Sequence, residues 1–506
     1  SKIIDEEREN YVDIPSLGYD PRVSPPTNIE ISVVEVLENG KPRIVSATGT
    51  DIKEGMIINT RSPSLESFRM IYLQSLLRNH YGDCVAPCVL RCPGHIDIQK
   101  YLYHVANGSF VEALAVIKES NPLPSVCGRV CPHPCEAECR RNAIDSPVNI
   151  NGVKRFIGDF DSYQTVDYVP PVAPDTGRKV AVIGAGPAGL TCAYFLRCLG
   201  NTVTIFEKQE AAGGMLRWGI PYYRLPEDTL DREIRSILNL GIEIRYSREL
   251  GKDFTIQSLK RGGYDAIFLG VGAQKSSRMG ISGEDLPGVM SGLDLLARLA
   301  RIEKPDLGNA VVVFGGGNTA MDAARSAIRL GAQKVIIAYR RTRAEMPAQD
   351  IEIEEAIEEG AEIMYLTAPL SIVKENDGLS INCIKMELGE PDASGRRRPV
   401  PVDGSEFTIS CSTIVTAIGQ IVDNDCIARD DLTTKHGTIL TNGFTTETSM
   451  PGVFSGGDCV SGPDIAISAI GAGKKAALDI DEYLRTGKCT TVADPYNCTK
   501  GRWDEI

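Results

Sequence analysis

Cysteine is concentrated in one segment of this 506-residue chain. Seven of the fifteen cysteines fall between residues 84 and 139, namely Cys84, Cys88, Cys92, Cys127, Cys131, Cys135 and Cys139. Structural zinc uses paired cysteines roughly two to four residues apart, about four to a site, and seven thiolates divide poorly in that way. They suit two four-iron clusters in which one ligand is not cysteine, with zinc or unliganded thiols as the alternatives. We therefore predict a segment that passes single electrons.

A glycine-rich turn lies within Lys179–Glu207, KVAVIGAGPAGLTCAYFLRCLGNTVTIFE. The pattern predicts strand, turn, helix and strand, as in dinucleotide sites. Gly184 permits the tight turn, Gly186 lets backbone approach a pyrophosphate, and Gly189 lets the helix pack on the strand. Glu207 stands where a carboxylate accepts hydrogen bonds from a ribose 2′-hydroxyl and repels a 2′-phosphate. We expect FAD or NAD here; the flanking elements disfavour a chance match in a loop.

A second turn of the same kind begins at Val311, in VVVFGGGNTAMDAARSAIRLGAQKVIIAYRR, and forms the one clear internal repeat. Where the first copy ends in an acid, this one ends in Arg340 and Arg341, with Arg343 close by. Guanidinium groups bind phosphate in a bidentate way and are permanently charged. This copy is therefore expected to prefer NADP over NAD, with a solvated basic turn as the alternative.

The elements that position these residues follow from the apolar pattern. Strands are expected at 31–36, 43–46 and 56–59. A helix is expected over 64–79, and its apolar side would contain Leu65, Phe68, Ile71, Tyr72 and Leu76.

Between the two cysteine groups the sequence predicts two helices, broken at Asn107–Gly108 and stopped by Pro122. Pro132 and Pro134 interrupt a regular helix, so the thiolates of the second group are expected on a folded loop. Buried strands are predicted at 266–274 and 414–420, and a helix from about residue 463.

Composition narrows the class of protein. The hydrophobic fraction of 42% and the charged fraction of 24% are ordinary for a globular protein. A net charge of −13 argues against nucleic-acid binding as the main task. No apolar run approaches the roughly 20 residues of a membrane span, and the beginning of the chain, SKIIDEEREN, lacks the pattern of a signal peptide. We expect no membrane insertion and a cytoplasmic location.

The cysteine segment also carries a family resemblance. CVLRCPGHIDIQKYL and NPLPSVCGRVCPHPCEAECRRNAIDSPVNINGVKRF resemble the iron–sulfur domain shared by glutamate synthase small subunits, dihydropyrimidine dehydrogenase and the large subunit of electron-bifurcating NADH-dependent ferredoxin:NADP oxidoreductase. The resemblance implies two four-iron clusters. This chain has one cysteine fewer in its first group and Cys127 as an added candidate. Where relatives supply Gln or Glu it offers Gly152 and Lys154; His95 and His133 are expected to be structural.

The first 83 residues resemble part of a plant-type two-iron ferredoxin domain, as in iron hydrogenases, through EGMIINTRSPSLESFR and LLRNHYGDC. The cluster cysteines of that domain are missing, so it can hold no two-iron cluster. We expect a degenerate docking module, or else a structural extension.

Together these observations predict an α/β flavoprotein with two dinucleotide-binding domains. The expected divisions are a degenerate ferredoxin-like, β-rich module without cluster (1–83), a helical four-iron cluster domain (84–168), an FAD domain in two parts (169–289 and 418–486), an inserted NADP-binding, Rossmann-like domain (290–417) and a tail (487–506). Cys489 and Cys498 in the tail are expected to be free, with a partner-facing ligand as the alternative.

The resemblance also implies where the dinucleotides bind. GGMLR after Glu207 would lie along the FAD, and Asp458 would hold the ribityl chain. No residue is expected to act as a nucleophile, so no catalytic residue is predicted. The expected cofactor-binding residues are Gly184, Gly186, Pro187, Ala188, Gly189, Glu207, Lys208, Gly214, Met215, Leu216, Arg224, Gly272, Gly315, Gly317, Asn318, Thr319, Arg340, Arg341, Gly419, Gly457, Asp458 and Ile465.

A function follows from combining the sites. Nicotinamide gives a hydride, clusters pass single electrons, and a flavin exchanges with both. No site for a small-molecule substrate other than NADP(H) is visible, so partner subunits are expected. The first hypothesis is the NADP(H)-reacting FAD subunit of an electron-bifurcating transhydrogenase, with an NADH-binding flavin/iron–sulfur subunit, a ferredoxin-like subunit and ferredoxin as partners. The alternatives are a glutamate synthase small subunit and a non-catalytic, zinc-stapled scaffold.

Overall fold

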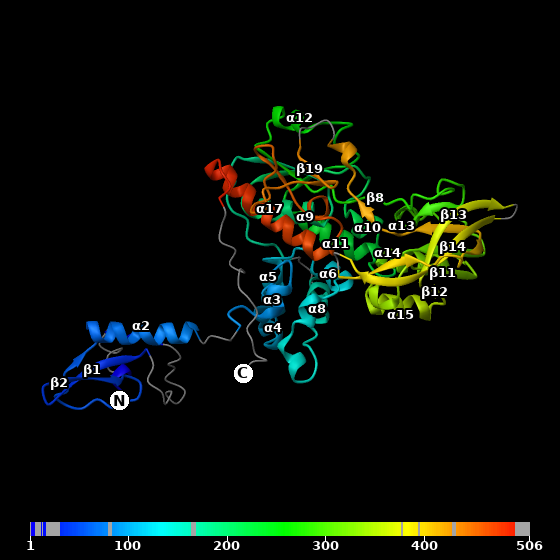
Figure 1. The fold of residues 1–506 in the computed structure, drawn as a ribbon. Coiled ribbons are helices and arrows are strands. Elements are labelled where there is room, and N and C mark those ends of the chain that lie inside the picture. Colours follow the sequence, from blue (N-terminus) through cyan, green and yellow to red (C-terminus); the bar gives the residue numbers. More distant parts are fainter. Residues whose placement is uncertain are drawn as a thin grey trace. The chain divides into compact units, whose positions relative to one another are not determined.

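The computed structural model describes residues 2–5, 12, 14–16, 31–78, 83–162, 168–375, 378–392, 395–427 and 432–490 (Figure 1). The described residues form two compact units, and the chain passes from one to the other after Val85. Cys498, most of the expected tail and residues 163–167 at the end of the expected cluster domain lie outside the described residues. Among the described helices, none has the length and apolarity that crossing a bilayer requires.

The described part of the first unit contains a small antiparallel sheet and the helix α2. Strand β1 (Val33–Glu38) pairs with β2 (Lys41–Ser46) and with β3 (Ile58–Asn59), as the apolar alternation predicts. Its core contains Ile3, Ile4, Ile14, Val34, Val36 and Ala47.

Helix α2 (Pro63–Arg78) follows this sheet at nearly the predicted position, but its apolar side is mostly not buried. Only Leu65 is buried, whereas Ile71 is 67% exposed. Polar bonds hold the helix: the Arg69 guanidinium donates to the carbonyls of Val33 at 2.7 Å and Thr60 at 3.2 Å.

The cysteine segment opens the second unit as a group of short helices. The break at Asn107–Gly108 is confirmed, since Gly108 has a φ of +71° between α4 and α5. The expected loop through the second cysteine group is partly wrong, because Cys127 lies inside α6. Pro132 does end that helix. The helices are α3 (Pro87–Arg91), α4 (Ile98–Ala106), α5 (Phe110–Lys118), α6 (Pro124–Val130), α7 (Pro134–Ala137), η1 (Arg140–Ala143) and α8 (Ile150–Ser162).

Two five-stranded parallel sheets make up most of the rest. The first sheet has the order β21-β7-β4-β5-β6. Strand β21 comes from a part of the chain far beyond the other four strands. The chain therefore leaves this sheet and later returns to it. Its elements are β4 (Lys179–Ile183), α9 (Pro187–Cys198), β5 (Thr202–Phe206), α10 (Met215–Trp218), α11 (Glu227–Leu238), β6 (Glu243–Arg245), α12 (Ile256–Arg261), β7 (Ala266–Leu269), β21 (Val453–Ser455), α16 (Asp458–Ser461) and α17 (Ala466–Thr486).

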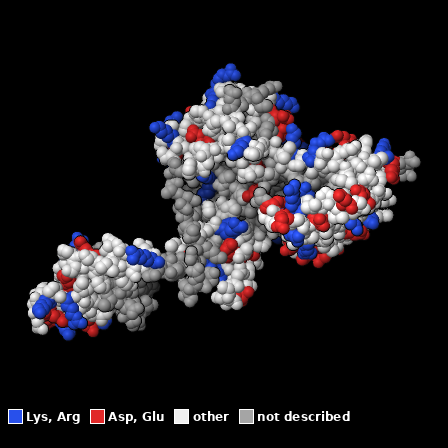
Figure 2. All heavy atoms as spheres, in the orientation of Figure 1, with Lys and Arg blue, Asp and Glu red and all other residues white. Residues whose placement is uncertain are grey.

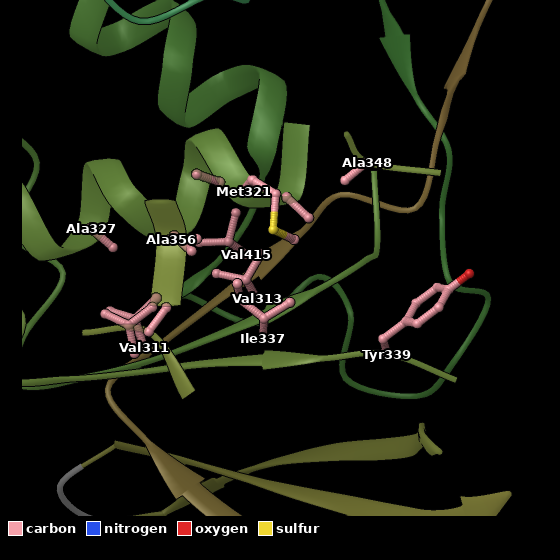
Figure 3. Close-up of a cluster of buried hydrophobic side chains, with 14 of the residues drawn as sticks. Val311, Val313, Met321, Ala327, Ile337, Tyr339, Ala348, Ala356 and Val415 are labelled. Atoms are coloured by element: carbon pink, nitrogen blue, oxygen red, sulfur yellow. The ribbon is translucent and has the colours of Figure 1, made fainter. Parts of the chain in front are cut away.

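The second sheet has the order β12-β11-β10-β17-β9 and lies in the intervening part of the chain. Figure 3 shows its core, where Val311, Val313, Ile337 and Val415 of the strands meet Met321 of a covering helix. The elements are β9 (Val289–Ser291), α13 (Gly292–Ala300), β10 (Ala310–Phe314), α14 (Asn318–Arg329), β11 (Lys334–Ala338), η2 (Arg343–Glu345), α15 (Asp350–Glu358), β12 (Glu362–Met364) and β17 (Thr413–Thr416).

An antiparallel sheet is inserted between β12 and β17. It packs on the second sheet through Ile372, Ile381, Cys383 and Ile409, and its hairpins extend from that lobe in Figure 1. Its strands are β13 (Thr367–Glu375), β14 (Gly378–Pro391), β15 (Arg397–Pro401) and β16 (Phe407–Cys411). Two short pairs complete the described strands: β8 (Lys275–Ser276) with β18 (Gln420–Ile421), and β19 (Thr434–Lys435) with β20 (Thr438–Ile439), preceded by η3 (Asn424–Cys426).

Helix α17 touches the cysteine segment and the first glycine turn through two glycines. A Cβ on Gly471 would stand 2.3 Å from the Pro93 carbonyl oxygen, next to Cys92. A Cβ on Gly473 would stand 2.3 Å from the Ala188 carbonyl oxygen, at the start of α9. Only glycine allows such close backbone contact.

We predict that Gly471→Ala destabilises the protein by roughly 1–3 kcal/mol, because the added methyl must push α17 away from Pro93. Denaturant unfolding of the purified protein measures the change. Leu478→Ala, at a half-exposed position of the same helix, is the control. An equal effect of both substitutions would contradict the close contact.

Candidate functional site

One cavity of about 1040 Å³ joins the two glycine turns to the cysteine segment. Its wall contains Cys131 and the neighbouring Arg129, Val130 and His133, as well as residues of both parallel sheets. Of the residues expected to bind cofactors, all lie on this wall except Gly189, Lys208 and Gly457. Lys208 lines a small neighbouring pocket instead.

The first glycine turn has the geometry that its sequence predicts. Gly184 has a φ of +98°, and a Cβ there would meet the Gly270 carbonyl oxygen at 2.4 Å. A Cβ on Gly189 would meet the Gly184 carbonyl oxygen at 1.9 Å, which explains why this glycine lies behind the wall and not on it. A Cβ on Gly186 would make only an ordinary contact, 3.8 Å from the Gly214 Cα.

Glu207 closes this part of the cavity. Its carboxylate accepts hydrogen bonds from the N–H groups of Ala185 at 2.7 Å and Gln209 at 2.8 Å. Burial raises its pKa above the usual value. Carboxylate oxygens have further lone pairs for a ribose hydroxyl, so the residue fits a dinucleotide without a 2′-phosphate.

The returning chain supplies the other wall of the first site. Burial raises the pKa of Asp458 to about 6, and the residue begins α16 after Gly457, whose φ is +81°. Ile465 and Ala466 at the start of the 21-residue helix α17 also line the cavity. The positive end of a helix dipole favours an anionic group there, so this wall fits a flavin that gains electrons.

The second turn is equally close-packed. A Cβ on Gly315 would meet the Ala417 carbonyl oxygen at 2.3 Å, and a Cβ on Gly316 would meet the Tyr339 ring at 2.5 Å. The Asn318 side-chain oxygen accepts a hydrogen bond from the Gln349 N–H at 3.0 Å. Asn318, at the start of α14, lies on the cavity wall.

The three arginines that follow β11 have different environments. Arg340 is exposed and lines the cavity. Arg341 is buried and its guanidinium pairs with Asp392 at 2.6 Å. Arg343 pairs with Asp350 and Glu354 at the surface. Of these guanidinium groups, that of Arg340 is thus the one available to a ligand phosphate.

Arg224 links the two parallel-sheet regions at the cavity. Its guanidinium pairs with Asp322 of α14 at 2.7 Å and with Glu352 of α15. Burial raises the pKa of Asp322 to about 7, although the arginine opposes this shift. Arg325 belongs to the same group of charges and contacts Glu352 at 3.4 Å. Acidic and basic side chains are also interspersed on the surface of the part of the molecule that contains α15 in Figure 1 (Figure 2).

Lys154 lies among the thiols of the second unit. It is 5% exposed on α8, in the stretch where the resembling family can supply Gln or Glu as a ligand. Burial lowers its pKa, the thiols Cys127, Cys131, Cys92 and Cys135 raise it, and the net shift is upward.

The thiols share one environment. Burial raises the pKa of Cys127 to about 12 and that of Cys135 to about 12, and Lys154 opposes both shifts. The pKa of Cys88 is also raised, mainly by burial, and the nearby Cys139 and Cys92 raise it further. None of the described cysteines is in a disulfide. A buried ammonium beside several thiols suits an anionic iron–sulfur group, so the donor set fits one. In the described residues no group of three or more His, Cys, Asp or Glu side chains is arranged around a single metal ion.

Three other expectations can be compared with the structure. The ring nitrogens Nδ1 of His95 and His133 lie 3.2 Å from the carbonyls of Val89 and Cys131, respectively, as expected of structural imidazoles. Cys489 donates to the Asp479 carbonyl at 3.0 Å. Cys84 falls in the first unit and the other six cysteines of the segment in the second.

Sequence reasoning missed several residues of the cavity wall. Arg129 and Asn151 come from helices around the cysteines, Asp322 and Glu352 from the second-sheet region, and Arg396 from the antiparallel sheet. Their positions depend on contacts between elements far apart in the chain. Only the run of three arginines at 396–398 is a signal that the sequence itself offers.

The fold and the cavity define a two-dinucleotide flavoprotein preceded by an iron–sulfur region, and comparison with known families agrees. The family model described as pyridine nucleotide-disulphide oxidoreductase matches residues 178–473. The model described as dihydropyrimidine dehydrogenase domain II, 4Fe-4S cluster, matches residues 81–166. The chain therefore belongs to the pyridine nucleotide-disulphide oxidoreductase family and carries a four-iron cluster domain.

Curated relatives make the class more specific. The chain is 45% identical to the NADP(+)-dependent formate dehydrogenase subunit beta of Moorella thermoacetica, over 81% of this chain and 61% of the relative. It is 42% identical to the NADPH-Fe(3+) oxidoreductase subunit beta of Geobacter sulfurreducens, over 81% and 65%. It is 36% identical to the glutamate synthase [NADPH] small chain of Escherichia coli (strain K12), over 78% and 88%. The chain is thus similar to subunits of NADP(H)-linked oxidoreductases, and it spans under two thirds of the first two relatives.

Solved structures share the fold. FprA of Mycobacterium tuberculosis in complex with NADPH superposes with a TM-score of 0.53 at 19% identity, covering 64% of this chain and 88% of that one.

We predict different outcomes for alanine at two glycines of the first turn. Gly189→Ala should destabilise the protein, because its methyl would overlap the Gly184 carbonyl. Gly186→Ala should preserve the fold and weaken FAD binding, because the space it fills lies toward the pyrophosphate. Thermal unfolding and the flavin-to-protein absorbance ratio measure the two effects. Equal loss of stability in both variants would contradict this division.

We predict that the ionisation of Glu233 on α11 makes the free energy of unfolding depend on pH. Its carboxylate accepts from the N–H groups of Ser125 at 2.6 Å and Val126 at 2.9 Å. Burial raises its pKa from 4.5 to about 7, so folding favours the protonated form. Its contribution to stability is present below about 4.5 and is lost as pH rises through about 7. Compared with Glu233→Gln, the wild type should lose unfolding free energy over that interval; parallel curves would refute this.

Proposed function

We propose that this chain is the NADP(H)-reacting FAD subunit of a multi-subunit, electron-bifurcating transhydrogenase that also involves NADH and ferredoxin. Bound FAD would supply hydride exchange with nicotinamide and single-electron exchange with iron–sulfur groups. The observation that carries the proposal is the single cavity, whose wall contains both glycine turns and Cys131.

The roles of the residues follow from their places on that wall. The turn at Gly184–Gly186, with Glu207, would hold the adenosine and pyrophosphate of FAD, and Asp458 with the start of α17 would face the ring system. The turn at Gly315–Gly317 would hold NADP(H). Backbone N–H groups, and no nucleophile, would perform the work by orienting two ring systems against each other.

The seven cysteines would hold two four-iron clusters, one of them with an incomplete cysteine set. Electrons would pass through this segment to partner chains, an NADH-binding flavin/iron–sulfur subunit and a ferredoxin-like subunit, in the cytoplasm. The small first unit, which has no expected counterpart in a glutamate synthase small chain, would dock one of these partners.

A glutamate synthase small subunit is the second candidate, favoured by the 36% identity to the Escherichia coli small chain over 88% of that protein. In that case the electrons would go to a large glutamine-dependent subunit.

Isolation of the native complex tests the proposal. We expect co-purification of NADH-binding and ferredoxin-like chains, and ferredoxin-dependent exchange between NADH and NADP⁺. Flavin absorbance should bleach with NADPH faster than with NADH in the isolated subunit, because an arginine faces the second site. A large glutaminase-like partner would select the second candidate. Bleaching at equal rates by both nucleotides would refute NADP specificity.

A further inference from the structure

Arg396 lines the cavity near the end of β11, although it comes from the hairpin between β14 and β15. The antiparallel sheet is fastened at that point. The Thr367 N–H donates to the Tyr339 carbonyl at 3.0 Å, and the Leu366 N–H donates to the Arg341 carbonyl at 3.2 Å. The beginning of β13 therefore runs beside the residues that follow β11.

Arg341 fixes the hairpin as well. Its Nη2 contacts an Asp392 carboxylate oxygen at 2.6 Å, and its Nε donates to the Arg397 carbonyl at 2.7 Å. These partners lie on either side of the hairpin loop. Arg341 also lines the cavity, but it is only 4% exposed, and its Nε and Nη2 are used in holding the loop.

The three consecutive arginines of the hairpin have separate places. Arg396 is half-buried on the cavity wall. Arg397 donates to the carbonyls of Leu388 at 2.6 Å and Gly389 at 3.2 Å, which closes the hairpin. Arg398 is exposed and is absent from the cavity wall.

We propose that Arg396 and Arg340 together bind the 2′-phosphate of NADP(H), and that Arg341 positions Arg396 through Asp392 without contacting the phosphate. This inference rests on the proposed use of NADP(H). A phosphate monoester carries a charge of about −1.5 to −2 at neutral pH, which two guanidinium groups from separate segments neutralise. Arg340 supplies the one from the end of β11, where the ribose lies in this fold.

The test compares dissociation constants for NADP⁺, NAD⁺ and adenosine 2′,5′-bisphosphate, measured by titration calorimetry on the FAD-loaded subunit. Arg396→Ala should weaken NADP⁺ and the bisphosphate by about ten- to a hundred-fold and leave NAD⁺ unchanged. Arg398→Ala, the matched control on the same hairpin, should change none of them. Asp392→Asn should also weaken NADP⁺ selectively, although it removes no cation.

Other results would contradict either the assignment of Arg396 or the proposed use of NADP(H). Equal weakening of NADP⁺ and NAD⁺ by Arg396→Ala, or the same effect from Arg398→Ala, would overturn the assignment. Arg396→Lys keeps the charge and should recover part of the bisphosphate affinity, so its failure to do so in a variant with wild-type unfolding temperature would also overturn it. Wild-type protein that binds NADP⁺ and NAD⁺ alike would instead refute the proposed use of NADP(H), which separates the two failures.

Discussion

The contact that the rest of the second unit depends on is the double approach of α17 to backbone. Through Gly471 it lies against Pro93 beside Cys92, and through Gly473 against Ala188 at the first glycine turn. Its amino end, at Ile465, meanwhile lines the cavity. One rigid helix therefore fixes the distance between the cysteine segment and the dinucleotide turn. Electron transfer between two groups requires such a fixed separation, and a side chain at either glycine would increase it.

The two dinucleotide regions are held by charge, not by apolar packing alone. Arg224, Asp322 and Glu352 form a nearly buried group in which one guanidinium serves two carboxylates. Removing ions from water is costly, and the cost is offset only when the partners keep their geometry. Such a group favours one arrangement of the two regions over many. The family resemblance implies that Arg224 binds a cofactor. In the structure its guanidinium lies on the cavity wall and is already paired with these two carboxylates.

Local patterns were predictable and distant contacts were not. Both glycine turns follow from spacing within about 30 residues, because strand, turn and helix are adjacent in the chain. The run at Arg340 and Arg341 predicted a phosphate site. In the structure the two arginines have different environments, because Arg341 pairs with Asp392. Asp392 lies in a hairpin that the sequence of the turn does not predict. The apolar side predicted for helix α2 is mostly not buried, and Arg69 joins the helix to the sheet through a hydrogen bond to the Val33 carbonyl. The pattern of one element cannot show which neighbour will satisfy it.

Lys154 is a buried cation near the point where the resembling family can supply a further cluster ligand. Relatives resembling this segment supply an amide or carboxylate at this point, which can donate electrons to iron, whereas a charged ammonium has no lone pair to give. Its side chain nevertheless remains buried among Cys92, Cys131 and Cys135. A buried cation beside thiolates compensates their negative charge, and net charge is one of the properties that set the reduction potential of an iron–sulfur group. Lys154 would therefore act on a cluster held by these thiols through its charge and not through a bond to iron.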